Sequence, residues 1–306
     1  LARLFYSPPE PHPAAAAAAA AAGPASEPLL SSPIAPQAEA DDTRAGPSVT
    51  VLQTCDGSSD YALMLEATGA VNRAYARRWG YQYARHDGVL RGYRAHHAMY
   101  NRIYLLRDLA ARERRFGTPG RAHWLLYLDA DAYVRDPSRS VGSVLAELGA
   151  CDRLMVYARG ADPRPGNLAD LNDGVFLLNL SHPSALAFSE AWLALAEMAA
   201  PDSALRANDT WSIPVAPAPG SPPGSPVLQV EDQSLCSAIV AILGAFGRAG
   251  DLFLRLTGEH DKLMNYEGSW VVQEIRAHSD TPEDRLRKVR DGAARASKPE
   301  PGAPGP

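Results

Sequence analysis

Short strand-like segments alternate along the chain with longer segments in which apolar residues recur at helical spacing. The segments at 49–52, 81–84 and 124–128 predict strands. Between them, apolar residues recur at intervals of three and four over 61–79 and 96–114, which predicts two amphipathic helices. This alternation predicts an α/β fold built on a mainly parallel sheet.

The same alternation continues over the second half of the chain. The predicted strands are 153–157, 174–180, 252–254 and 269–273, and the predicted helices are 183–198 and 231–246. One stretch, 213–226, is rich in proline and glycine, and we predict that it forms a surface loop.

The two ends of the chain differ in composition from the middle. Residues 1–47 are mostly alanine, proline, serine and acids without apolar periodicity, which predicts a disordered tail or stem. Residues 292–306 end in the same style and are predicted to be a second disordered tail. The folded part is therefore predicted to be a single domain over 48–291.

The predicted strand at 124–128 ends in two acids, Asp129 and Asp131, separated only by Ala130. Residues i and i+2 of an extended backbone point to the same side, so both carboxylates can converge on one ligand. Two hard oxygen donors suit Mg²⁺ or Mn²⁺, whose open coordination sites are commonly filled by phosphate. The motif predicts binding of a nucleotide diphosphate through a metal, although acids after a strand can also cap a helix or bind water.

Other polar residues lie at predicted strand ends, where ligands of open α/β sheets bind. They are Asp56, Asp60, Asn172 and Asp173. For Asp56 and Asp60, capping of the following helix is the alternative to nucleotide contact. No glycine-rich phosphate loop follows any predicted strand, so a metal and arginines are expected to bind the phosphates.

Composition narrows the possible partners. The 306 residues are 46% hydrophobic, which is ample for a core, and the net charge of −5 gives no general attraction to nucleic acid. Three widely spaced cysteines indicate neither a zinc site nor a disulfide framework. No apolar run approaches the ~20 residues of a membrane span. Because the chain begins at Leu1 and not at methionine, we expect that a signal segment or a membrane anchor precedes this sequence.

Five segments in register resemble those of GT-A nucleotide-sugar glycosyltransferases, and most closely the galactosyl and xylosyl transferases of family 34. The segments are Tyr75–Tyr81, Tyr100–Leu106, Leu126–Ala132, Asn172–Asn179 and Glu231–Leu235. The match spans about residues 49–280. The resemblance implies a GT-A type, Rossmann-like, mostly parallel sheet flanked by helices. It also implies transfer of a hexose or pentose from a nucleotide diphosphate sugar, expected to be a uridine diphosphate sugar, to a glycan or glycoprotein hydroxyl with retention of configuration.

The resemblance also implies roles for individual residues. Asp129 and Asp131 match the metal motif, with Asp129 also reaching the nucleotide, and Asn172, Asp173 and Gly174 match the segment beside the transferred sugar. Asp232 and Gln233 match the acid and amide near the anomeric carbon, so Asp232, Gln233 and Asp173 are the predicted catalytic residues. Arg102 falls where the family has a lysine near the donor. A solvated charge is the alternative for Arg102, and a helix-dipole acid is the alternative for Asp232.

The chain departs from the family pattern near its end. Many members provide a late histidine as the third metal ligand, whereas Gln273 stands at that position here. Its amide oxygen could bind a hard cation, and His278 and His260 are alternatives, of which His278 is the predicted ligand. The family also implies the lumen of the Golgi or of another secretory compartment, reached as a type II membrane protein.

Two other functions are compatible with the motif. Phosphatases of the haloacid dehalogenase type also place Asp-x-Asp after an apolar strand, with the first acid as nucleophile and the second as proton donor. That family expects threonine or valine where this chain has Tyr133. The second alternative is a nucleotide-sugar binding module without catalytic activity.

Overall fold

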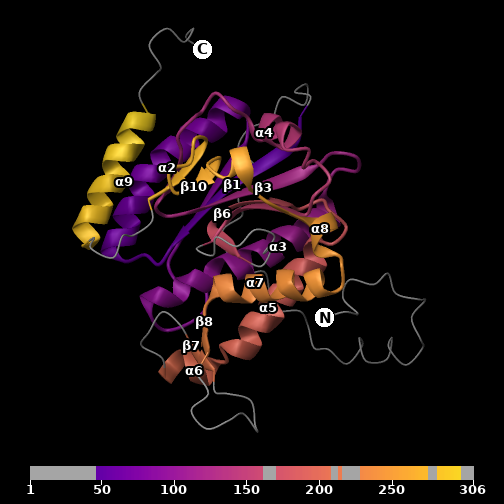
Figure 1. Cartoon of the computed structure of the whole chain (residues 1–306). Coiled ribbons are helices and arrows are strands. Elements are labelled where there is room, and N and C mark those ends of the chain that lie inside the picture. Colours follow the sequence, from indigo (N-terminus) through magenta and orange to yellow (C-terminus); the bar gives the residue numbers. More distant parts are fainter. Residues whose placement is uncertain (1–45, 161–169, 208–212, 216–227, 275–280, 298–306) are drawn as a thin grey trace.

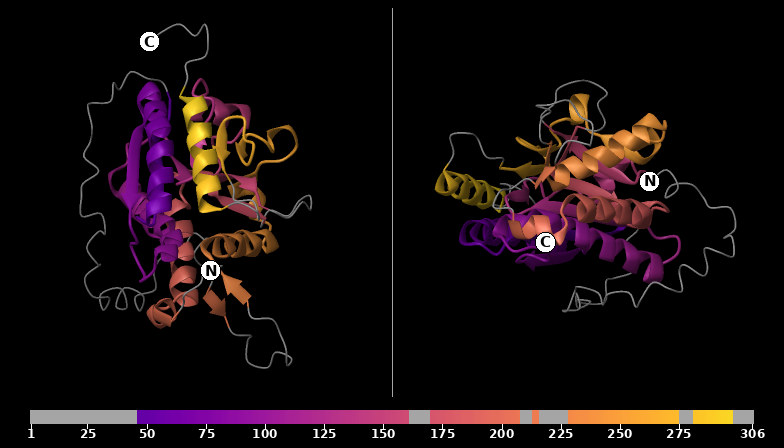
Figure 2. Two further views of the ribbon diagram at one scale, coloured as in Figure 1. Left: turned by 90° about the vertical axis from the view of Figure 1, so that its left-hand side faces the viewer. Right: turned by 90° about the horizontal axis from the view of Figure 1, so that it is seen from below.

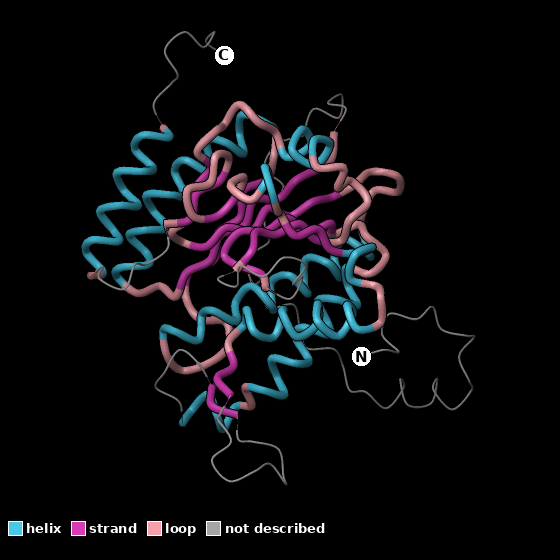
Figure 3. The backbone as a smooth tube through the Cα atoms, viewed as in Figure 1, coloured by secondary structure: helices cyan, strands magenta, loops and turns pink. Residues whose placement is uncertain are grey.

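A six-stranded sheet forms the centre of the molecule (Figures 1 and 3). The computed structural model describes residues 46–160, 170–207, 213–215, 228–274 and 281–297, and within these the strand order is β2-β1-β3-β6-β5-β9. Neighbours β2, β1 and β3 pair in parallel, as do β5 and β9, whereas β6 is antiparallel to both β3 and β5. The sheet is mostly parallel, as the sequence predicted. Its strands are β1 (Ser48–Cys55), β2 (Gln82–Asp87), β3 (His123–Asp129), β5 (Met155–Arg159), β6 (Leu171–Asn179) and β9 (Phe253–Arg255).

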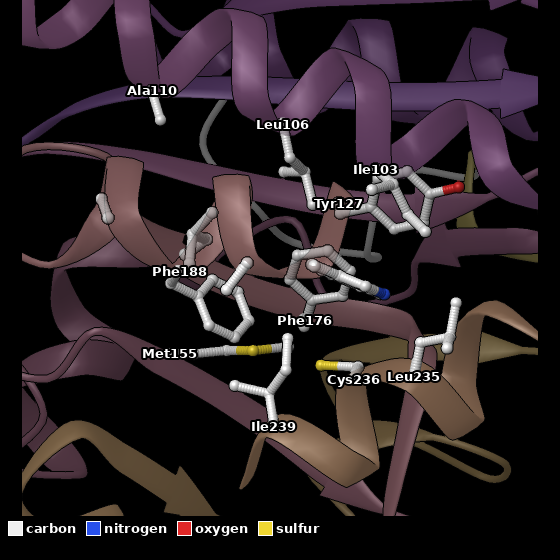
Figure 4. Packing of buried hydrophobic residues seen from close by; sticks show 14 of the residues in the cluster. Ile103, Leu106, Ala110, Tyr127, Met155, Phe176, Phe188, Leu235, Cys236 and Ile239 are labelled. Carbon is white, nitrogen blue, oxygen red and sulfur yellow. The ribbon is translucent and has the colours of Figure 1, made fainter. Parts of the chain in front are cut away.

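Helices cover both faces of this sheet, and the alternation of side chains along each strand determines which face each residue fills. On β3, Leu125 and Tyr127 face one core and Leu126 and Leu128 face the other. Because both faces are covered, β3 is a continuous apolar run. In Figure 4, Tyr127 and Phe176 lie in the first of these cores; their rings are stacked 5.0 Å apart.

The helices divide into two layers. The first core is closed by α3, α5 and α7, and the second by α2 and α4 (Figures 1 and 4). The helices are α2 (Ser59–Trp79), α3 (Asn101–Phe116), α4 (Val141–Glu147), α5 (Ala185–Ala199), α6 (Asp202–Ala207), α7 (Asp232–Ala245), α8 (Ala249–Leu252) and α9 (Pro282–Ala296), with 3-10 turns η2 (Ala95–Tyr100) and η3 (Gly258–His260). The helix predicted over 96–114 is thus a 3-10 turn followed by α3. In the described ranges, no helix has both the length and the apolar character needed to cross a bilayer.

Two smaller sheets accompany the central one. In the first, β11 (Val271–Gln273) lies between β10 (Met264–Asn265) and β4 (Ala132–Val134). The antiparallel pairing of β11 with β4 sets Gln273 opposite Ala132, directly after the two acids. In the second, β7 (Ile213–Val215) pairs with β8 (Leu228–Val230). The predicted loop over 213–226 therefore begins with a strand, and residues 216–227 lie outside the described part.

The C-terminal boundary predicted at residue 291 is wrong. Helix α9 continues to Ala296 and lies alongside α2 (Figure 2, left). Val289, Gly292 and Ala293 are buried, and Ala293 packs with Val71 and Tyr133. The sequence analysis missed this helix because its composition is basic and polar. Only a narrow strip of mostly small side chains packs against the rest of the protein. The predicted N-terminal tail lies outside the described residues except for Gly46 and Pro47, and β1 begins at Ser48.

Candidate active site

Four carboxylates meet at one edge of the central sheet. Asp129 ends β3, and Asp131 follows in the turn to β4. Asp173 lies near the start of β6, which is antiparallel to β3, so the start of β6 is at the same edge as the end of β3. Asp232 is the first residue of α7. We call Asp129, Asp131, Asp173 and Asp232 the acid cluster.

One buried arginine joins three members of the acid cluster. The guanidinium of Arg102, in the first turn of α3, lies 2.9 Å from Asp129 Oδ1, 2.9 Å from Asp173 Oδ1 and 2.9 Å from Asp232 Oδ2. It also stacks over the ring of Tyr127, 4.8 Å from its centroid. Only 8% of its side chain is exposed, so the alternative of a solvated surface charge is wrong. The planar guanidinium suits this role because it presents several donors in fixed directions.

The backbone of the turn that carries Asp129 and Asp131 is held by buried polar side chains. Gln53 Nε2 of β1 donates to the carbonyls of Asp129 and Ala132 at 3.2 and 3.3 Å. On α2, Thr68 donates to the carbonyl of Ala130 at 2.9 Å, and Asn72 donates to the carbonyl of Ala132 at 3.0 Å. These bonds satisfy carbonyl groups that would otherwise be buried without partners, and they fix the directions of the two acids.

Asp131 is held by a residue that the sequence did not predict. Arg285 of α9 donates to Asp131 Oδ2 at 2.5 Å and to the Tyr61 hydroxyl at 3.1 Å. Gln273 Nε2 lies between the two acids, 3.1 Å from Asp129 Oδ2 and 3.3 Å from Asp131 Oδ1. The sequence did not predict this role for Arg285, because its partner Asp131 is 154 positions away. The expectation that a buried acid needs a nearby cation pointed to such a residue but did not identify it.

Gly174 permits the close approach of Gln273. A Cβ atom on Gly174 would lie 2.2 Å from Gln273 Nε2 and 2.7 Å from Asp129 Oδ2. Its backbone N–H donates to Asn172 Oδ1 at 2.8 Å. Asn172 and Gly174 therefore shape the start of β6 beside the acid cluster, as their place in the sequence suggested, and the structure gives each a local structural role.

Burial and mutual repulsion make it harder to ionise the carboxylates of the acid cluster. Among the described residues, the four carboxylates pair with two guanidinium groups, which would leave two negative charges without a partner there if all the acids were ionised. Burial raises the pKa of Asp129 to about 6, with Arg102 opposing this and Asp131 adding to it. Burial also raises the pKa of Asp173 well above its usual range, again against Arg102, and the neighbouring Asp232 adds to the rise. The site therefore favours additional positive charge.

Several buried polar atoms near the acid cluster lack a hydrogen-bond partner among the described residues. They are Asp173 Oδ2, Asp232 Oδ2, Arg102 Nε, Gln273 Oε1 and the hydroxyl of Tyr100, although Arg102 Nε and Asp232 Oδ2 form an ion pair with each other. Tyr100 precedes α3, and after burial the nearby charge of Asp232 contributes most to raising its pKa. Unsatisfied buried groups are uncommon in folded proteins, and a catalytic role or a bound ion or water is among their explanations. Tyr100 is a site residue that sequence reasoning missed.

The remaining predicted site residues differ in burial and in their position relative to the acid cluster. Gln233 is half-buried and adjoins Asp232 in the first turn of α7. Asp60 is exposed in the first turn of α2, where its charge complements the helix dipole. His278 lies outside the described residues. Within the described ranges, no group of three or more His, Cys, Asp or Glu side chains is placed to hold one metal ion, so a cation at Asp129 and Asp131 would need further ligands of another kind. His260, the other alternative, lies close to Glu147 and Glu259, at 3.7 and 3.6 Å.

Comparisons with known proteins give a structural match only. No protein family matches the chain, and no curated protein does. Among solved structures, the chain is similar to a glycosyltransferase involved in the glycosylation of the major capsid of PBCV-1, at 15% identity and a TM-score of 0.50, over 80% of this chain and 100% of that one. It is also similar to the glycosyltransferase GlyE of Streptococcus pneumoniae TIGR4, at 12% identity and a TM-score of 0.36, over 81% of this chain and 60% of that one. The first likeness shows that the chain shares the fold of that glycosyltransferase.

Proposed function

We propose that the protein is a metal-dependent glycosyltransferase that moves a hexose or pentose from a nucleotide diphosphate sugar to an acceptor hydroxyl. The observation that carries this proposal is the convergence of Asp129, Asp131, Asp173 and Asp232 on one edge of a glycosyltransferase fold, where Arg102 and Arg285 are the cations that pair with them among the described residues. The family 34 resemblance of the sequence supports a uridine diphosphate sugar as donor, a glycan or glycoprotein as acceptor, retention of configuration and a secretory compartment.

The residues around Asp129 and Asp131 fit a hard divalent cation such as Mn²⁺ or Mg²⁺. Both acids offer carboxylate oxygens, and Gln273 offers an amide oxygen, Oε1, that is buried and unpartnered within the described chain. Rotation of the Gln273 amide by half a turn would direct this oxygen toward the acids, because its nitrogen now lies between them. A bound cation would neutralise charge that develops on the leaving diphosphate.

The other acids lie where they can act on the sugar. Asp173 Oδ2 has no hydrogen-bond partner among the described residues, so it can accept a bond from a sugar hydroxyl. Asp232 is held by Arg102 at 2.9 Å and would stabilise positive charge near the anomeric carbon. Arg102 keeps both carboxylates close to Asp129, and Gln233 follows Asp232 on the same helix turn. In this proposal Arg102 orients the acids and does not meet the donor directly.

A donor screen tests the proposal. The protein is incubated with uridine and guanosine diphosphate sugars and Mn²⁺, and released nucleotide is measured for the wild type, Asp131→Ala and the control Asp251→Asn. Asp251 is an exposed residue of α8 whose carboxylate pairs with Arg248. We expect release that depends on Mn²⁺, is lost in Asp131→Ala and is retained in the control.

Three results would contradict the proposal. If Asp131→Ala released as much nucleotide as the wild type, the metal motif would take no part in the reaction. Hydrolysis of an aryl phosphate with Mg²⁺, without release from any sugar donor, would favour the phosphatase function. Nucleotide binding without release, measured by calorimetry, would favour the binding module.

A further inference from the structure

The strongest feature that the proposed function leaves unexplained is the contact between α9 and Asp131. Only 2% of the Asp131 side chain and 15% of the Arg285 side chain are exposed, and Arg285 Nη2 lies 2.5 Å from Asp131 Oδ2. A buried carboxylate is costly unless it is paired and hydrogen-bonded. Arg285 therefore supplies the compensating charge for Asp131 in this structure.

Arg285 is directed to Asp131 by three further contacts. Its Nη1 donates to the Tyr61 hydroxyl at 3.1 Å, its Nε donates to the carbonyl of Glu274 at 3.3 Å, and its guanidinium lies 5.5 Å from the centre of the Tyr61 ring. Glu274 directly follows Gln273, whose amide occupies the other oxygen of Asp131 at 3.3 Å. Both oxygens of Asp131 are thus bonded to nitrogen donors of the protein.

A divalent cation that bound Asp131 would compete with Arg285 for its carboxylate. A guanidinium and a divalent cation on the same buried carboxylate repel each other strongly at low effective dielectric. The two positive charges therefore compete for Asp131. The repulsion also reaches Arg102 through Asp129, but Asp173 and Asp232 hold Arg102 in place. Arg285 pairs with Asp131 as its one acidic partner in the described part of the chain.

We propose that Arg285 is a built-in counter-ion of Asp131 that a divalent cation must displace, so that the docking of α9 is coupled to metal loading. The proposal rests on the metal site of the proposed function. In this role Arg285 is a positioning residue: it keeps Asp131 oriented in the metal-free protein and lowers the apparent affinity for the cation. Release of Arg285 removes one of the polar contacts that hold α9 against the domain.

The first experiment measures Mn²⁺ binding by calorimetry in the wild type, in Arg285→Gln and in Arg287→Gln, with no nucleotide present. Arg287 is a matched control because it is an exposed arginine of the same helix that pairs with Asp284 at 2.6 Å. We expect Arg285→Gln to bind Mn²⁺ about tenfold more tightly than the wild type, since contacting charges are coupled by about this much. Arg287→Gln should match the wild type.

Equal or weaker binding by Arg285→Gln, with the wild type binding Mn²⁺, would overturn the counter-ion role while leaving the proposed function intact. If neither protein binds Mn²⁺, both the metal-dependent function and this inference fail. If Arg285→Gln binds more tightly but no sugar donor is turned over, the counter-ion role stands and the proposed reaction fails.

A second experiment on the wild type covers the case in which Arg285→Gln does not fold. Hydrogen exchange is followed over α9 and α5 with and without Mn²⁺. We expect Mn²⁺ to speed exchange in α9 and leave α5 unchanged. Slower or unchanged exchange in α9 at saturating Mn²⁺ would overturn the proposal.

Discussion

Gly174 and Gln273 pack so closely that no side chain fits between them: a Cβ on Gly174 would lie 2.2 Å from the amide nitrogen of Gln273. The same Cβ would lie 2.7 Å from Asp129 Oδ2. The absence of a side chain at Gly174 thus leaves room for Gln273 to reach Asp129 and Asp131.

Replacement of Gly174 by alanine should therefore disturb the site. We expect Gly174→Ala to lose about 1–3 kcal/mol of unfolding free energy through overpacking and to lose most nucleotide release. Urea unfolding and the donor assay measure the two effects. Gly250→Ala is the control, because a Cβ there meets nothing within 4 Å; a Gly174→Ala protein as stable as this control would contradict the steric argument.

Arg102 should be indispensable to the acid cluster. Arg102→Met leaves Asp129, Asp173 and Asp232 without their shared cation, and we expect it to cost about 3–5 kcal/mol. Arg102→Lys keeps one charge without the planar array of donors. Its loss of unfolding free energy, measured by urea unfolding, should be smaller than that of Arg102→Met but still measurable. Wild-type stability in Arg102→Lys would show that the geometry of the guanidinium is unimportant.

Asp129 should make stability depend on pH in a direction opposite to that of a typical surface carboxylate. Because burial raises its pKa to about 6 from 3.8, the folded protein binds a proton more tightly than the unfolded chain does. This contribution to stability is fully present below about pH 4 and is lost as the pH rises through about 6.

Thermal unfolding in a metal chelator between pH 4 and pH 7 measures this effect. The difference in stability between Asp129→Asn and the wild type should grow in favour of the variant as the pH rises from 4 to 6, and then stay constant. A difference that is independent of pH would contradict the assignment of the raised pKa to Asp129.

Helix α9 should belong to the folded domain in solution. A chain that ends at Asp291 loses the buried Gly292 and Ala293, and we expect it to be about 1–2 kcal/mol less stable than one that ends at Ser297. Thermal unfolding of the two proteins tests this expectation. Equal melting temperatures would mean that the last helical turn contributes nothing to the fold.

Much of the site was visible in the sequence because its parts lie at the ends of predicted elements. Asp129 follows an apolar strand, and ligands of open α/β sheets bind at such carboxyl ends. Asp173 opens another strand and reaches the same edge because β6 runs antiparallel to β3, which the sequence did not show. Asp232 begins a helix, where an acid is also expected for electrostatic reasons, so its meeting with Arg102 could not be derived from local pattern. The metal ligand predicted at His278 stays a prediction.

The sequence by itself determined the α/β architecture and the placement of Asp129 and Asp131 at a strand end, because hydrophobic periodicity and strand ends are local properties of the chain. The tertiary structure alone decided that Arg102 would join three acids, that Gln273 would lie opposite Ala132 and that Arg285 would reach Asp131 from a polar helix near the end of the chain. Those contacts join residues far apart in sequence. They depend on how helices and strands pack against each other, and no local pattern encodes that packing.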